Sequence, residues 1–361
     1  MTEIKTLTTP LQPGATIGIL GGGQLARMLT MAAARLGLKC CIYSDVDAPA
    51  FDVAAAHILA PYDDAAALAR FAEKCDAITF EFENIPAAAT AYLAARKPLA
   101  PNAHALEVTQ DRISEKTLIA SLGLKVPPFF AVSTPEEATA AAEKIGGPCV
   151  LKTRRFGYDG KGQATIKDAS EAAAAFTTLN APCILEGFVD FAFEASVIAA
   201  RGYDGSFAAF DPPRNEHEHH ILRRSTVPSP LSAAQIDEAK AIAKKIADAL
   251  GYVGTFAVEL FVGRDGTLMI NETAPRVHNS GHWTIEACQT SQFEQHIRAV
   301  AGWPLGTPER HSDVVMENIL GFEAADYIGL AKRGALHLYG KAEMREGRKM
   351  GHLTMLKPKS R

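Results

Sequence analysis

A glycine-rich basic loop, Val150–Gln163, contains the residues best suited to hold a polyphosphate. The loop follows a short apolar strand and combines glycines with cations: Lys152, Arg155, Gly157, Gly160, Lys161 and Gly162. Glycines let the backbone point several N–H groups at one place, and nearby cations favour an anion there. The pattern is typical of a flap that closes over phosphates. A hairpin with a solvated basic tip has the same residues, and the loop alone does not decide between the two.

Two glutamates, Glu259 and Glu272, lie on two predicted strands that are joined by a tight turn. Antiparallel strands bring residues equidistant from the turn face to face, so the two carboxylates are expected to meet. With the amide of Asn271 they form an oxygen-only set suited to Mg²⁺, which completes its shell with water and phosphate. The alternative is two solvent-facing acids on an amphipathic hairpin.

Polar side chains crowd into the segment that follows Glu272. Arg276 offers a planar fork for a small carboxylate-like anion, and His278 and Asn279 can orient that anion. An ordinary polar loop is the alternative. The histidine-rich run Asn215–His220 lacks the H-E-x-x-H spacing of a helical zinc site, so solvated side chains are expected there.

Two further patterns could bind a phosphate. Residues Gly21–Ala26 fit G-x-G-x-x-A between a predicted strand and helix, as in a dinucleotide-binding turn. A tight turn whose helix N-terminus binds another anion is equally consistent with this pattern. Near the C-terminus, Lys341, Arg348 and Lys349 form a basic cluster that suits a phosphomonoester or a charged surface.

The elements that must position these residues begin with alternating strands and helices, which predict a parallel sheet with right-handed crossovers. Strands are expected at 16–22, 39–44 and 77–82, and helices at 24–36 and 64–74. A linking helix (109–121) precedes a second group of strands. A hairpin (193–200 with 205–210), a long amphipathic helix (232–250) and a strand pair (255–262 with 267–271) follow.

Bulk composition limits the function classes. A chain of 361 residues exceeds one ordinary core, so two or three domains are expected. The net charge is −4 with no basic block, which gives no reason to expect nucleic acid as a partner. No apolar run reaches membrane-spanning length, so no membrane partner is expected. Six cysteines without a C-x-x-C pair indicate reduced core residues of a cytosolic protein.

In this order, the motifs resemble the ATP-grasp enzymes and, more narrowly, the N5-carboxyaminoimidazole ribonucleotide synthetases of purine synthesis. The similarity covers nearly the whole chain. Its most specific segments are Gly21–Leu25 and Thr79–Pro86, and the Asn-Glu-x-x-Pro-Arg pattern is shared widely among ATP-grasp ligases. The remaining matches are Gln110–Arg112, Lys152, Gly157–Gln163, Glu186–Val189, Asn271–His282 and Arg348–His352.

The resemblance implies a fold of α/β and α+β class. It comprises a Rossmann-like domain (1–108), a small ATP-grasp subdomain (109–190), a large one (191–300) and a C-terminal β-rich unit (301–361). The implied activity is ATP-dependent carboxylation of 5-aminoimidazole ribonucleotide with bicarbonate, through carboxyphosphate, by a cytoplasmic homodimer.

The resemblance also implies site residues. ATP would contact Arg112, Lys152, Gly157, Tyr158, Asp159, Gly160, Lys161, Gly162, Gln163, Glu186, Gly187, Phe188, Val189, Glu194, His217, Asn271 and Glu272. Mg²⁺ would be held by Glu259 and Glu272. The ribonucleotide would contact Gln24, Leu25, Glu81, Tyr158, Asp159, Lys341, Arg348 and Lys349, with Glu83 as a further candidate. Bicarbonate would meet the catalytic residues Arg276, His278 and Asn279.

Two positions depart from the family pattern. Ala26 replaces the usual helix-start glycine, where a small residue suffices. His220 replaces a glycine in the Asn-x-His-x-x-Gly-Ile-Leu segment, which puts the local backbone and the contact of His217 with the nucleotide in doubt.

Three other functions stay open from the sequence. One is another ATP-grasp ligase, such as a formate-dependent glycinamide ribonucleotide transformylase. A nicotinamide-dependent dehydrogenase built on Gly21–Ala26 is the second, and a non-catalytic nucleotide-binding regulator is the third.

Overall fold

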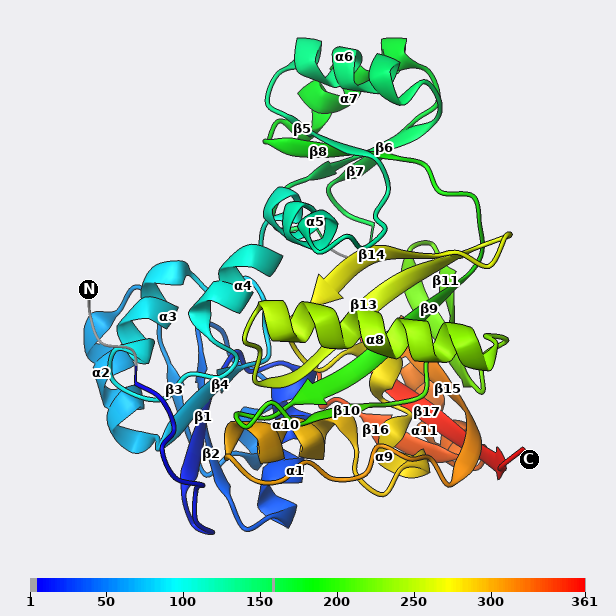
Figure 1. Ribbon diagram of the computed structural model, residues 1–361. Helices are drawn as coiled ribbons and strands as arrows, with labels where there is room; N and C mark the ends of the chain where they lie inside the picture. Colours follow the sequence, from blue (N-terminus) through cyan, green and yellow to red (C-terminus); the bar gives the residue numbers. More distant parts are fainter. Residues whose placement is uncertain (1–4, 158–159, 361) are drawn as a thin grey trace.

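The computed structural model describes residues 5–157 and 160–360, and within them the chain forms three β-sheets (Figure 1). The N-terminal sheet is parallel, in the order β3-β2-β1-β4. Its strands are β1 (Thr16–Leu20), β2 (Lys39–Ser44), β3 (Ala56–Leu59) and β4 (Ala77–Phe80). Its helices are α1 (Gln24–Arg35), α2 (Ala65–Lys74), α3 (Ala87–Ala94) and α4 (Ala103–Thr109). The parallel pairing of these strands confirms the predicted parallel sheet.

The small subdomain is an antiparallel sheet in the order β5-β8-β6-β7, with helices α6 and α7 packed on one face (Figure 1, top). Its elements are β5 (Phe129–Val132), α6 (Pro135–Ile145), β6 (Cys149–Thr153), β7 (Gln163–Ile166), α7 (Ala172–Leu179) and β8 (Cys183–Gly187). The glycine-rich loop joins β6 to β7, and Lys152 pairs with Gln163 at its base. The loop therefore extends from a hairpin, as both interpretations of its sequence require.

The linking helix predicted at 109–121 is observed with a later start, at Arg112. Helix α4 ends at Thr109, and α5 (Arg112–Ser121) begins after Asp111. The Asp111 carboxylate accepts hydrogen bonds from the N–H groups of Ile113 and Ser114, at 3.0 and 3.2 Å. This N-cap sets Arg112 at the first helical position.

The largest sheet has the order β14-β13-β9-β11-β12-β15-β17-β16, and β10 pairs with β9. Its strands are β9 (Phe191–Arg201), β10 (Phe207–Ala209), β11 (Arg214–Glu218), β12 (Ile221–Val227), β13 (Gly254–Gly263), β14 (Leu268–Ala274), β15 (Ser312–Leu320), β16 (Ala335–Leu338) and β17 (Lys349–Pro358). The C-terminal strands continue this sheet through the pairing of β12 with β15. The predicted domain boundaries stay predictions, and the one after residue 108 falls within the last turn of α4.

Helix α8 (Ala233–Ala249) covers the large sheet, and its apolar face forms a core with β9, β13 and β14. Helices α9 (Thr284–Ala287), α10 (Gln292–Val300) and α11 (Tyr327–Ala331) complete the described elements. Helix α10 packs against α1, so the large sheet and the N-terminal domain share a core. Among the residues that the structure describes, no helix is long and apolar enough to cross a membrane.

Helix α8 begins with a capping box, in which Ser232 and Gln235 exchange side-chain and backbone hydrogen bonds. Ser232→Ala removes the oxygen that accepts the Gln235 N–H, so we expect a loss of about 1 kcal/mol in the free energy of unfolding. Urea unfolding measures this loss, and Ser232→Asp, which keeps a capping oxygen, is the control. An equal loss in both variants would contradict the capping argument.

Candidate active site

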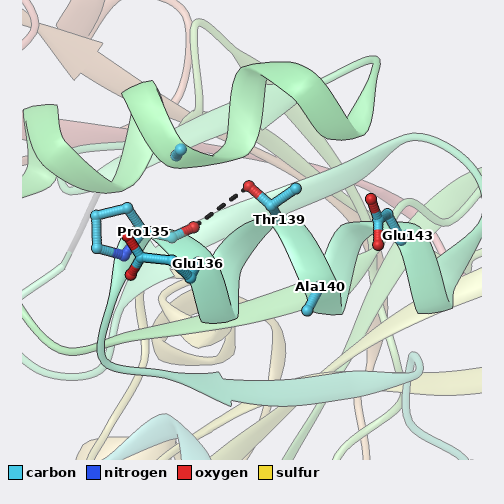
Figure 2. Close-up of a pocket in the computed structure, with 6 residues that line it drawn as sticks. Pro135, Glu136, Thr139, Ala140 and Glu143 are labelled. Atoms are coloured by element: carbon cyan, nitrogen blue, oxygen red, sulfur yellow. Dashed lines mark hydrogen bonds between the residues drawn. The ribbon is translucent and has the colours of Figure 1, made fainter.

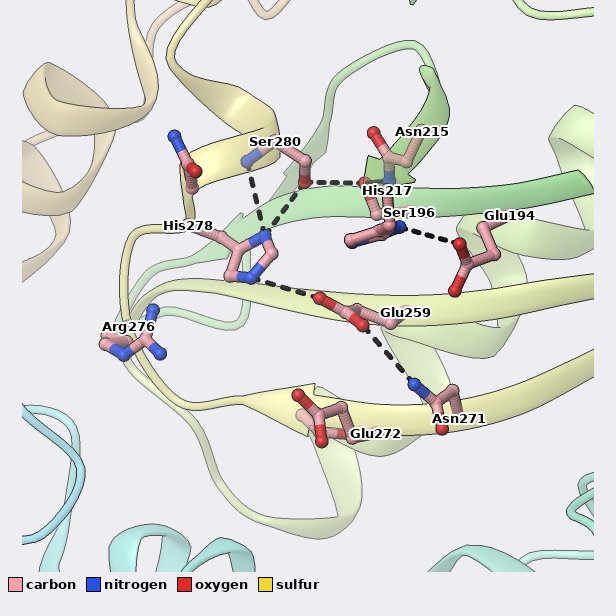
Figure 3. A network of polar contacts seen from close by, with 12 residues as sticks. Glu194, Ser196, Asn215, His217, Glu259, Asn271, Glu272, Arg276, His278 and Ser280 are labelled. Carbon is pink, nitrogen blue, oxygen red and sulfur yellow. Dashed lines mark hydrogen bonds and ion pairs between the residues drawn. The ribbon is translucent and has the colours of Figure 1, made fainter. Parts of the chain in front are cut away.

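Strands β13 and β14 place Glu259 and Glu272 directly opposite each other (Figure 3). The register shifts immediately afterwards, because Leu260 pairs with Ile270 and Asn271 is an extra residue in β14. Simple alternation would turn Asn271 and Glu272 to opposite faces, but this bulge re-aims Asn271. The Asn271 Nδ2 atom therefore donates to Glu259 Oε2 at 3.4 Å. The predicted pair of carboxylates meets because of this bulge, since a regular register would place Asn271 opposite Glu259.

Each of the two carboxylates already has a side-chain partner. Arg112 Nη1 donates to Glu272 Oε2 at 2.7 Å, and His278 Nε2 lies 3.1 Å from Glu259 Oε1. Burial opposes ionisation of Glu259, but His278 outweighs it and lowers the pKa of this carboxyl to about 2. Glu259 is therefore an anion at neutral pH.

The oxygen atoms of this pair suit a hard cation. Within the described residues, Asn271 Oδ1 is a buried oxygen without a hydrogen-bond partner. An unsatisfied buried oxygen beside two carboxylates is the chemistry that Mg²⁺ prefers. Across residues 5–157 and 160–360, no group of three or more His, Cys, Asp or Glu side chains forms a metal site by itself. The residues thus fit an ion that also takes oxygens from phosphate and water.

Lys152 lies at the end of β6, as the sequence predicts, and its Nζ is 2.5 Å from Glu186 Oε2. The other oxygen of Glu186 is 3.1 Å from Nζ of Lys116, a fully buried lysine on α5. Burial raises the pKa of Glu186, but the two lysines outweigh it and bring that pKa to about 2. Both carboxylate oxygens of Glu186 lie in ion pairs with lysines. The segment Glu186–Val189 would therefore bind an adenine ring through its backbone groups. Phe188 beside it is exposed.

The flap glycines have specific steric roles. Gly160 and Gly162 have φ values of +77° and +71°, a region that side chains rarely adopt. A Cβ atom on Gly162 would lie 2.7 Å from Thr153 Oγ1, so the loop folds tightly against β6. Arg112 Nη2 donates to Gly157 O at 3.5 Å. The predicted contacts of Tyr158 and Asp159 lie outside the described residues.

His220 explains the departure from the family pattern. Its φ is +64°, and His219 before it has φ +50°, so the turn from β11 to β12 keeps a left-handed backbone without glycine. The His220 side chain lies against Gly160, where an added Cβ would come within 2.7 Å of it. His217 keeps its place, with Nδ1 2.6 Å from Glu194 Oε2. Burial lowers the pKa of His217, but Glu194 reverses the effect and raises it.

His278 is held by a chain of buried hydroxyl and amide groups (Figure 3). Its Nδ1 is 2.8 Å from Ser280 Oγ, and Ser280 Oγ is 2.7 Å from Ser196 Oγ. Asn215 Nδ2 in turn donates to Ser196 Oγ at 2.9 Å. The chain fixes the ring so that the opposite nitrogen, Nε2, faces Glu259.

The other two predicted catalytic residues have different partners. Arg276 forms an ion pair with Glu83, which comes from the N-terminal domain. Burial raises the pKa of Glu83, but Arg276 outweighs it and lowers that pKa. The amide of Asn279 exchanges two hydrogen bonds with that of Asn318, at 2.9 and 2.7 Å. Asn279 is thus directed toward strand β15.

Glu81 closes the N-terminus of α1. Its Oε1 accepts a hydrogen bond from the N–H of Gly23 at 2.8 Å, and burial raises the pKa of its carboxyl. A carboxylate of the protein therefore occupies the place where a dinucleotide-binding turn holds a pyrophosphate. Leu25 is buried, which leaves its backbone for a ligand, and Gln24 is half-buried.

The C-terminal basic cluster lies beside the N-terminal domain. A Cβ atom on Gly340 would be 3.3 Å from Nη1 of Arg27, which is on α1. Lys341 Nζ donates to the carbonyl of Lys349 at 2.7 Å, and Arg348 Nη1 donates to that of Glu343 at 2.7 Å. The start of α1 and the basic cluster, distant in sequence, can therefore face one ligand.

A small cavity of about 60 Å³ lies beside Arg112, Glu272 and Arg276. Its lining comes from both the N-terminal and ATP-grasp parts and includes Glu83, Arg112, Glu115, Arg155, Phe156, Gly157, Glu272 and Arg276. A second pocket, of about 330 Å³, lies on α6 far along the small subdomain (Figure 2). It is lined by Pro135, Glu136, Thr139, Ala140, Glu143 and Ala173, and it contains none of the predicted site residues.

The sequence reasoning missed several residues of the site. Glu115 and Lys116 lie three and four positions after Arg112, which puts all three on one face of α5. Asp111, which caps α5, also binds Arg154 Nη2 at 2.8 Å. The spacing of Glu115 and Lys116 from Arg112, at i+3 and i+4 of a predicted helix, is the sequence signal that places them together.

Comparisons with known proteins agree with this geometry. Family models match residues 14–110 as a ribonucleotide synthetase preATP-grasp domain and 117–293 as an ATP-grasp domain. Residues 314–361 match a phosphoribosylaminoimidazole carboxylase C-terminal domain. The N5-carboxyaminoimidazole ribonucleotide synthase of Brucella melitensis is 51% identical over 98% of this chain and 99% of its own. That of Bacillus subtilis is 43% identical, over 96% and 93%.

Solved structures give the same result. An ADP complex of an N5-carboxyaminoimidazole ribonucleotide synthetase has a TM-score of 0.93 at 42% identity, covering 97% of this chain and 94% of its own. The Aspergillus clavatus enzyme, in complex with ADP and 5-aminoimidazole ribonucleotide, has a TM-score of 0.90 at 28% identity, covering 96% and 94%.

These matches confirm the fold class and the ligase function expected from the motifs, and they decide against the three other functions left open by the sequence. The chain belongs to the N5-carboxyaminoimidazole ribonucleotide synthase family of ATP-grasp enzymes, which acts in purine biosynthesis.

Proposed function

We propose that this chain binds MgATP between β14 and the β6–β7 flap and carboxylates 5-aminoimidazole ribonucleotide in the adjoining cavity. The observation that carries the proposal is the opposed pair Glu259 and Glu272, with Arg112 2.7 Å from the second carboxylate. Two carboxylates that face a cation and a glycine-rich loop form a site for a metal-bound polyphosphate.

The phosphates of bound ATP would replace carboxylates of the protein as the partners of two cationic side chains. Arg112 and Lys152 would hold phosphate oxygens, and Gly157–Gln163 would close over them. Glu186–Val189 would meet the adenine edge, while Glu194 and His217 would lie at the ribose. Glu259, Glu272 and Asn271 would hold Mg²⁺, which supplies charge neutralisation at the phosphoryl group.

The reaction asks the protein for positioning more than for covalent chemistry. A bicarbonate oxygen attacks the γ-phosphorus as the bond to ADP breaks, which yields carboxyphosphate. The exocyclic amine of the ribonucleotide then bonds to the carbonyl carbon, phosphate leaves, and the amine proton goes to a basic oxygen or nitrogen. Arg276 would neutralise the bicarbonate, with His278 and Asn279 beside it, and closure of the flap would exclude water.

The ribonucleotide would lie between α1 and the C-terminal basic cluster. Gln24, the backbone of Leu25, and Glu81 would face its base and ribose, with Tyr158 and Asp159 reaching it from the flap. Lys341, Arg348 and Lys349 would bind its phosphate, because they offer charge-assisted donors on the side of α1 where Arg27 meets Gly340.

The assay that tests the function compares two mixtures by ADP release: aminoimidazole ribonucleotide with bicarbonate, and glycinamide ribonucleotide with formate. We expect turnover in the first mixture. Absence of ADP there would overturn the proposal.

Lys152→Ala should raise the KM for ATP about tenfold, since a charged hydrogen bond is lost, and should spare the KM for the ribonucleotide. Lys341→Ala should do the reverse. If both constants moved together in either variant, the two sites would be wrongly assigned.

The role of the flap has its own test. Gly160→Ala places a Cβ against His220 and forces a side chain to φ +77°, so kcat/KM for ATP should fall about tenfold. Gly205→Ala is the control, because Gly205 has φ +80° in the turn between β9 and β10, away from the flap. An equal fall in both variants would assign the loss to general strain and contradict the flap role.

The chain is also proposed to act as a homodimer in the cytoplasm. All six cysteines are free and buried, which suits a reducing compartment. Phe322, Tyr327 and Ile328 are exposed apolar residues of the C-terminal unit, at 69%, 53% and 58%, and such a group is typical of an interaction surface. Light scattering should give twice the chain mass of 38.6 kDa, and a monomer mass would refute the dimer.

A further inference from the structure

Helix α5 contacts strand β14 along four consecutive residues. Lys116 Nζ donates to the carbonyls of Ile270 and Asn271, at 3.1 and 2.6 Å. Arg112 binds the Glu272 carboxylate, and Glu115 accepts a hydrogen bond from the N–H of Thr273. Because β14 is the edge of its sheet, these outward backbone groups have no neighbouring strand to bind them. Side chains of α5 form hydrogen bonds with these backbone groups instead.

Lys116 also connects this strand to the small subdomain. Its ammonium lies 3.1 Å from Glu186 Oε1 at the end of β8, and the second oxygen of Glu186 binds Lys152 at 2.5 Å. The buried ammonium of Lys116 therefore contacts both the strand that carries Glu272 and the carboxylate of Glu186. The same carboxylate pairs with Lys152, the proposed phosphate ligand. Figure 1 shows α5 between the small sheet and β14.

These groups are costly to bury. Lys116 is 0% exposed, and Glu115 and Glu186 are each 3% exposed. Buried ion pairs of this kind add little net stability, because desolvation offsets their attraction, although they do define a geometry. Burial lowers the pKa of Lys116 and raises that of Glu115 to about 7, as expected where charges are separated from water.

We propose that Glu115 and Lys116 are positioning residues, which hold the backbone of β14 on both sides of Glu272 and couple that strand to the nucleotide site through Glu186. The inference rests on the proposed function, since it assumes that Glu272 meets Mg²⁺ and Lys152 meets phosphate. When phosphate takes Lys152, Glu186 keeps Lys116 as its remaining partner. Lys116 in turn keeps the carbonyls beside Glu272 in place.

The coupling is measured by titrating ADP into the whole enzyme in a calorimeter, with and without Mg²⁺. The wild-type chain should bind ADP more tightly with Mg²⁺. Lys116→Met, which keeps the length of the side chain and removes its charge, should reduce this Mg²⁺ enhancement at least fivefold. Thr117→Ala is the matched control, because Thr117 lies on the exposed face of α5, and it should leave the enhancement unchanged.

A second readout separates positioning from simple stability. Hydrogen exchange at the Thr273 amide should accelerate at least tenfold in Lys116→Met and in Glu115→Leu, which removes the oxygen that accepts the Thr273 N–H, while amides in the core of α8 keep their wild-type rates. A purely structural role would instead change exchange in both places. Wild-type Mg²⁺ enhancement and Thr273 exchange in a folded Lys116→Met chain would overturn the inference.

If Lys116→Met does not fold, Glu115→Gln tests the coupling by the same ADP titration. This variant keeps the shape of the side chain and cannot carry a negative charge. We expect a threefold loss of Mg²⁺ enhancement, and no loss would again overturn the inference. The two proposals fail differently. A wild-type chain that binds no ADP, or binds it equally well without Mg²⁺, refutes the MgATP site itself, whereas an intact wild-type effect that survives in the variants refutes the coupling alone.

Discussion

The candidate site depends on the mutual neutralisation of charges that are buried together. Arg112 pairs with Glu272, Lys152 shares Glu186 with Lys116, and Arg276 pairs with Glu83. A charge removed from water without a partner costs several kcal/mol, so no member of these pairs can be kept alone. The protein therefore holds the cations Arg112, Lys152 and Arg276 each beside a carboxylate that an anionic ligand could displace.

Ligand binding in such a site is an exchange of partners. Under the proposed function, a phosphate oxygen that took Arg112 would release Glu272, and the released carboxylate opposite Glu259 would suit Mg²⁺. The nucleotide would thus create part of the proposed metal site, and the metal would neutralise the charge that the nucleotide brings. This reciprocity follows from electrostatics and requires no large rearrangement of the sheets.

The fold supplies these partners from separate units. The small sheet provides Lys152 and Glu186, the edge of the large sheet provides Glu259 and Glu272, and the N-terminal domain provides Glu83. Helix α5 lies between the small sheet and the edge of the large sheet. Its side chains form hydrogen bonds with the outward backbone groups of β14. An edge strand is suited to this role, because a strand inside the sheet has no free backbone groups to be held.

Residue types and local spacing determined much of this protein. The turn between β13 and β14 brings Glu259 close to Glu272, and glycines at 160 and 162 suit a backbone with positive φ. These features are local, so the order of residues along the chain suffices to predict them. Tertiary structure decided which charges meet across domains: Glu83 with Arg276, Glu81 with the start of α1, and Lys116 with Glu186. Such pairs join residues that are distant in sequence, and their partners are set by how sheets and helices pack. The β-bulge at Asn271 likewise arises from pairing with β13, which no periodicity within β14 reveals.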